Sequence, residues 1–160
     1  MTNDDTPDVA KALAGLLARL PRREQPLLIA LAERLAAERY RGWAGQHEGP
    51  ARERLLACAD REEEIAGRIE ALQPDAAEVQ ARIRAENPDL QDINRTLFAS
   101  RPLPQQFAMQ AEGERLGAAT WRSFARHAEP SARETFEACA RLEEASAEVL
   151  EALLAEAAPS

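Results

Sequence analysis

The chain repeats itself, and this duplication constrains the fold more than any other feature of the sequence. Residues 7–72 align without a gap with residues 88–153 at an offset of 81, and 26 of the 66 aligned pairs are identical. Two copies are too few for a solenoid. At 160 residues the chain also has the size of one domain. We therefore predict a single domain over residues 1–160, in which the two repeats pack against each other about a pseudo-two-fold axis.

Each repeat has the sequence pattern of helices. Ala, Leu, Glu and Arg dominate, and aromatic residues make up only 4% of the chain, which disfavours a sheet protein. Prolines and glycines divide the pattern into short and long helices. The predicted helices cover residues 8–19, 24–46, 51–72, 73–86, 89–99, 104–127 and 132–156.

The connections between the long helices predict the architecture. The breaks at Gly49-Pro50 and at Glu129-Pro130 span few residues, so each pair of long helices must form an antiparallel hairpin. Residues 73–87 lie between the hairpins and predict a crossover linker helix. The sequence thus predicts an all-α four-helix bundle, built from two tandem helical hairpins with a long crossover, plus short accessory helices.

Charge and composition disfavour several classes of function. The net charge of −8 and the pI near 4.9 disfavour nucleic acid as a partner, and the apolar runs are too short for a membrane span. The acidic start of the chain (Asp4, Asp5 and Asp8) lacks the features of a signal peptide, and only two cysteines are present. We therefore expect a reduced cytoplasmic protein. Phosphate-binding loops and nucleophile motifs are missing, so the sequence identifies no small-molecule substrate.

Four glutamates interrupt the apolar faces of the long helices. In the second long helix of each repeat, Glu62 and Glu143 occupy a heptad-like core row where a leucine is expected. In the first long helices, Glu33 and Glu114 interrupt a stripe of apolar and aromatic residues. Folding the repeats together would bring the four glutamates toward one level of the bundle. A buried carboxylate must be protonated, salt-bridged or bound to a cation.

The spacing around these glutamates resembles that of the rubrerythrin and ferritin-like superfamily. Two motifs carry the resemblance, Glu33-x-x-Ala36-x-x-x-Tyr40-x-x-Trp43-Ala44 in a first long helix and Phe136-x-x-x-Ala140-x-x-Glu143-Glu144 in a second. The resemblance implies a ferritin-like bundle of the rubrerythrin type. It also implies that the glutamate ligands of a di-iron centre correspond to Glu33, Glu62, Glu114 and Glu143.

The chain departs from that family at the histidines of the centre. Where the family has Glu-x-x-His, this chain has Glu62-x-x-Ile65 and Glu143-x-x-Ser146. Imidazole ligands give iron sites affinity and a defined geometry. Four carboxylates alone can hold a hard cation such as iron or manganese, with less selectivity. The alternatives are protonated glutamates, glutamates turned toward solvent, and glutamates paired with some of the 19 arginines.

The cysteines and histidines have simple structural interpretations. Cys58 and Cys139 each lie on a core row one turn before a glutamate, and we interpret them as small buried residues. The alternatives are a thiolate ligand and a disulfide across the pseudo-two-fold axis. His47 and His127 lie near helix ends, away from the glutamates, so we assign them no ligand role.

Two classes of function remain. We rank first a structural or interaction module, because the family's histidines are missing. The alternative is a metal-binding redox or iron-handling protein that uses a carboxylate-only site for iron or manganese. The short helices predicted over residues 8–19 and 89–99 are apolar. The sequence leaves open whether they cap the bundle or mediate a homodimer. A small-molecule pocket beside Gly117 is a third option, for which no ligand is indicated.

Overall fold

The computed structural model describes residues 9–159, and every regular element among them is helical. In chain order the elements are α1 (Val9–Leu17), α2 (Gln25–Ala44), α3 (Gly49–Glu70), α4 (Ala76–Glu86), the 3₁₀ segment η1 (Pro88–Asp92), the π segment η2 (Asn94–Phe98), α5 (Leu103–His127) and α6 (Pro130–Ala157). The prediction of an all-α protein is confirmed. Within this range, no helix combines the length and the apolar content of a membrane span. The expectations about Asp4, Asp5 and Asp8 concern residues outside the described part.

Prolines mark the beginnings of the four long helices. Each of these helices has a proline in its first two positions, namely Pro26, Pro50, Pro104 and Pro130. The first backbone N–H groups of a helix have no partner within the helix, so the missing N–H of proline costs little there. Gly49 begins α3 with a φ of 59°, a left-handed conformation that glycine adopts without strain. The short turn between α2 and α3 therefore ends at this glycine.

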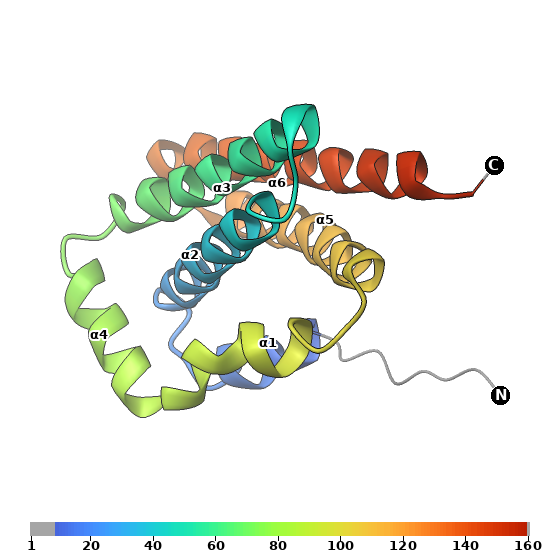
Figure 1. The fold of residues 1–160 in the computed structure, drawn as a ribbon. Helices are drawn as coiled ribbons and strands as arrows, with labels where there is room; N and C mark the ends of the chain where they lie inside the picture. Colours follow the sequence, from blue (N-terminus) through green and yellow to red (C-terminus); the bar gives the residue numbers. More distant parts are fainter. Residues whose placement is uncertain (1–8, 160) are drawn as a thin grey trace, which may run out of the picture.

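The four long helices form a bundle-like arrangement of two antiparallel hairpins (Figure 1). Helix α2 packs against α3, α5 packs against α6, and the hairpins meet where α3 lies along α6. Helix α4, η1 and η2 connect the hairpins, with α4 beside α2. The predicted antiparallel hairpins are confirmed.

The structure differs from the prediction in residues 89–99, which do not form one continuous helix. The 3₁₀ segment η1 and the π segment η2 take its place. Tertiary packing competes with regular helix geometry here, because Phe98 is buried against Trp43 with 6.4 Å between the ring centroids. Phe98 also lies beneath the guanidinium group of Arg39, whose carbon is 3.8 Å from the ring centroid.

Helix α1 and the turn that follows it cover the bundle. Helix α1 lies against α5, and the leucines that pack against the apolar core are Leu13, Leu16, Leu17 and Leu20. These side chains therefore contribute to the core of the bundle, and the homodimer stays a prediction.

The buried core consists of two apolar clusters, one around Trp121 and the other around Tyr40. On each long helix, the buried residues of one cluster precede a glutamate and those of the other cluster follow it. A layer of acidic side chains thus divides the core into two parts. We call these four residues the glutamate layer: Glu33, Glu62, Glu114 and Glu143.

Candidate metal centre

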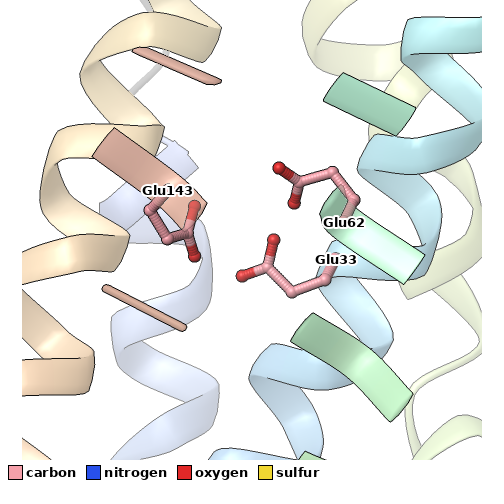
Figure 2. Close-up of side chains that lie close together, drawn as sticks. All are labelled: Glu33, Glu62 and Glu143. Carbon is pink, nitrogen blue, oxygen red and sulfur yellow. The ribbon is translucent and has the colours of Figure 1, made fainter. Parts of the chain in front are cut away.

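Three of the four predicted site residues meet in the interior of the bundle. Glu33 comes from α2, Glu62 from α3 and Glu143 from α6, and one carboxylate oxygen of each lies within 4.8 Å of the others. Figure 2 shows the three carboxylates directed toward one another from separate helices. Glu62 is fully buried, and Glu33 and Glu143 expose only 8% and 2% of their surface. We call these three residues the carboxylate triad.

The fourth predicted residue, Glu114 of α5, is held by other partners. Its Oε1 atom accepts hydrogen bonds from the Tyr40 hydroxyl at 2.6 Å and from the Gln110 side-chain amide at 2.9 Å. Its Oε2 atom is buried without a hydrogen-bond partner. Burial raises the pKa of Tyr40 well above its ordinary value, so the hydroxyl stays protonated and donates. One oxygen of Glu114 is therefore engaged and the other is free.

Surface arginines pair with other acids and leave the triad alone. Arg34, next to Glu33 in the sequence, forms salt bridges with Glu63 and Glu70. Arg115, next to Glu114, pairs with Glu151 at 2.9 Å. None of the salt bridges within residues 9–159 includes a residue of the triad. Among the described residues, direct pairing of the triad with an arginine is therefore not the arrangement, and Arg39 acts on Glu33 only through its charge.

Arg39 is a buried arginine whose hydrogen bonds lead to Glu114. Its Nε and Nη2 atoms donate to Gln110 Oε1 at 3.1 and 2.9 Å, and the Gln110 amide donates in turn to Glu114. Burial lowers the pKa of Arg39 to about 10, which leaves the side chain charged at neutral pH. The positive charge of Arg39 attracts Glu114 and also Glu62 and Glu33.

Burial is the main influence on the protonation of the triad. Burial raises the pKa of Glu62 and of Glu143 well above the ordinary value of 4.5, and repulsion from Glu33 and Glu114 adds to both shifts. The pKa of Glu33 is raised as well, again chiefly by burial. Without a cation, the triad therefore holds protons at pH values where exposed glutamates are ionised. A cation bound among these carboxylates would replace those protons.

Several buried oxygen atoms in this region have no hydrogen-bond partner. They include both carboxylate oxygens of Glu62, Oε2 of Glu114 and the hydroxyl oxygen of Ser146. Ser146 is fully buried one turn after Glu143 on α6. An unpaired buried oxygen is costly, and a bound cation would remove that cost.

Two residues of α5 hold the Glu143 carboxylate in place. The indole N–H of Trp121 donates to its Oε1 atom at 2.8 Å. The backbone of Gly117 approaches the same carboxylate so closely that a Cβ atom there would lie 2.6 Å from Oε1. The room that the sequence indicates beside Gly117 is therefore filled by Glu143 and not by a small molecule. The equivalent position of the first repeat carries Ala36.

Substitution of Gly117 by alanine is expected to destabilise the protein. Alanine normally stabilises a helix by about 0.5–1 kcal/mol relative to glycine. At this position the added methyl group displaces Glu143 from Trp121, at a cost of about 1–3 kcal/mol. Urea denaturation measures both effects, with Gly113→Ala as the control, because a Cβ atom at Gly113 meets no atom within 4 Å. An equal increase in the free energy of unfolding of the two variants would contradict the close contact between Gly117 and Glu143.

Sequence reasoning missed the side chains that support the glutamate layer. Tyr40 and Trp121 occupy equivalent positions of the two repeats, seven residues after Glu33 and Glu114. Both donate a hydrogen bond to a glutamate of the layer. The sequence did contain a signal for them. In both repeats, an aromatic residue that can donate a hydrogen bond follows the glutamate by seven residues on an otherwise apolar stripe.

The cysteines and histidines lie outside the triad. Cys58 and Cys139 are both buried and unpaired, so the disulfide alternative is wrong for this structure. Burial raises the pKa of both thiols, to about 12 for Cys139, which favours small buried residues over thiolate ligands. His47 bonds through Nδ1 to the Trp43 carbonyl at 2.8 Å, in the turn after α2, and His127 ends α5.

The structure by itself defines a class of molecule, an all-helical, bundle-like protein with a buried carboxylate triad. No family model, curated protein or solved structure matches the chain in comparisons with known proteins.

Proposed function

We propose that this protein is a divergent ferritin-like bundle that binds iron or manganese at the carboxylate triad. The observation that carries the proposal is the meeting of three buried carboxylates from three helices, without a salt bridge to any of them within the described residues. Buried charges in proteins are paired or bound to metal. The two antiparallel hairpins and the glutamate layer between the two apolar clusters support the ferritin-like assignment.

The residues do not fit a standard di-iron centre. Such a centre needs an imidazole one turn after each glutamate of the second helices, and those positions hold Ile65 and Ser146. Ile65 is fully buried and offers no ligand atom. The unpartnered oxygens of Glu62 fit a hard cation instead, because carboxylate oxygens are the donors that such ions prefer. The proposed site therefore uses oxygen donors alone.

The protein's own residues hold the site in position and exclude bulk water. Trp121 and Gly117 orient Glu143, and the apolar clusters on both sides of the layer keep the carboxylates buried. A bound iron or manganese ion would supply one-electron chemistry to this interior. The convergence of the three carboxylates supports the binding of an ion, and we assign no reaction to it.

Metal loading of the purified protein tests the proposal. Protein stripped with a chelator is expected to bind about one Mn²⁺ or Fe²⁺ ion per chain, as measured by elemental analysis after removal of free metal. Glu62→Ala is expected to lose this binding, because it removes two unpaired oxygens from the triad. Glu63→Ala is the matched control, because Glu63 is the next residue on α3 and pairs with Arg34 at the surface. Wild-type protein without metal after reconstitution would refute the proposal.

A structural or interaction module remains the second candidate function. The observation in its favour is that Ile65 fills one of the histidine positions with an apolar, fully buried side chain. On this proposal the glutamates remain protonated and the bundle acts through its surface, as a homodimer or with another partner. Light scattering after size exclusion tests the homodimer, and a monomer at high protein concentration would exclude it.

A further inference from the structure

The charges around the triad are arranged differently from those around Glu114. The Glu114 carboxylate is linked through Gln110 to the buried guanidinium of Arg39. The triad has no such partner among the described salt bridges and hydrogen bonds, apart from the neutral indole donor of Trp121. Arg39 also acts on Glu33 and Glu62 through its charge, but it carries only one positive charge. When the four glutamates are ionised, a net charge of three negative units therefore stays in the interior, where such charges are costly.

We infer that the carboxylate triad takes a hard trivalent cation, such as Fe³⁺ or a lanthanide ion, in preference to a divalent one. The inference rests on the proposed function, because it specifies the kind of ion that the same site binds. A trivalent ion neutralises three carboxylates. A divalent ion leaves one negative charge buried or one glutamate protonated, and either state costs free energy.

The donor atoms of the triad point to a hard cation. Glu62 is fully buried, and neither of its carboxylate oxygens has a hydrogen-bond partner. Large hard cations take more oxygen ligands than softer metals such as zinc. The atoms shown to converge are carboxylate oxygens alone, and both oxygens of Glu62 among them have no hydrogen-bond partner. Counted together, the four ionised glutamates of the layer and the one positive charge of Arg39 leave a net charge of three negative units for a cation to neutralise.

Trp121 makes the inference measurable with terbium. A Tb³⁺ ion near an excited indole ring accepts energy from it and emits visible light. The Trp121 indole donates directly to the Glu143 carboxylate, whereas Trp43 belongs to the apolar cluster around Tyr40 and its indole donates to Gln106. Ion binding at the triad is therefore expected to give emission that falls several-fold in Trp121→Phe and changes less in Trp43→Phe. Equilibrium dialysis reports binding in each variant independently of the light emitted.

The experiment compares the affinities of the metal-free protein for Tb³⁺ and Mn²⁺ by competition dialysis. Wild type is expected to retain bound Tb³⁺ against about a hundredfold excess of Mn²⁺. Glu62→Gln keeps the size of the side chain but lowers the charge of the triad by one. This variant is expected to lose at least about tenfold more affinity for Tb³⁺ than for Mn²⁺. Glu63→Gln, which removes the same charge at the surface, is expected to leave the ratio unchanged.

Each outcome distinguishes the inference from the proposed function. Binding of Mn²⁺ in wild type without a preference for Tb³⁺ overturns the inference and leaves the metal site in place. An equal loss of affinity for both ions in Glu62→Gln also overturns the charge argument. Failure to bind either ion removes the proposed function as well. Circular dichroism checks that Glu62→Gln is folded, and Glu33→Gln provides a second variant with the same change of charge.

Discussion

Conversion of Glu33, Glu62 and Glu143 together to glutamine is expected to abolish metal binding and leave the helical content unchanged. The amide side chains keep the size of the carboxylates but carry no charge, so the cation loses its main source of attraction. Glutamine oxygens are also weaker ligands than carboxylates for a hard cation. Elemental analysis and dialysis measure the loss, and circular dichroism measures the helices.

The matched control for the triple variant replaces three surface acids. Glu63, Glu70 and Glu151 pair with arginines on the outside of the bundle, so their conversion to glutamine removes the same charge without touching the triad. Metal binding is expected to survive in this control. Equal loss in both triple variants would show that general negative charge, rather than the triad, attracts the metal.

Replacement of Glu62 by leucine is expected to stabilise the metal-free protein by about 1–4 kcal/mol at neutral pH. Glu62 is fully buried, neither of its oxygens has a hydrogen-bond partner, and its neighbours in the same core row are Leu55 and Ile69. Leucine of similar size replaces a group that is costly to bury. Urea denaturation of chelator-treated protein measures the change in the free energy of unfolding.

The gain from the leucine variant is expected to depend on pH. Burial and repulsion from Glu114, Glu33 and Glu143 raise the pKa of Glu62, so the folded state keeps a proton that the unfolded state releases above pH 4.5. The free energy of unfolding of the wild type therefore falls as the pH rises above this value. The free energy of unfolding of the leucine variant falls less, because the variant lacks this carboxyl group. A surface substitution, Glu63→Leu, is expected to show the wild-type slope. A leucine variant that is less stable than wild type at neutral pH would contradict this description of Glu62.

The helices could largely be predicted from the sequence because prolines mark their beginnings. Pro26, Pro50, Pro104 and Pro130 all lie in the first two positions of a long helix, where proline is tolerated. Residues 89–99 could not be predicted in the same way. Their geometry depends on the burial of Phe98 against side chains distant in the sequence, and local helix signals do not contain this information.

The triad could be predicted because its glutamates interrupt apolar stripes of helical period, which places them inside the bundle. The different environment of Glu114 could not be predicted from the sequence. It depends on the hydroxyl of Tyr40 and on the chain from Gln110 to Arg39, and the side-chain conformations of these residues are set by tertiary packing. The repeat would predict four equivalent glutamates, whereas hydrogen bonds distinguish Glu114 from the other three.

Crystals grown with Mn²⁺ test the central claim most directly, through anomalous scattering from the ion. We predict an anomalous peak inside the bundle, bounded by the carboxylates of Glu33, Glu62 and Glu143. Anomalous peaks confined to surface acids, or an arginine side chain inserted among these three carboxylates, would contradict it.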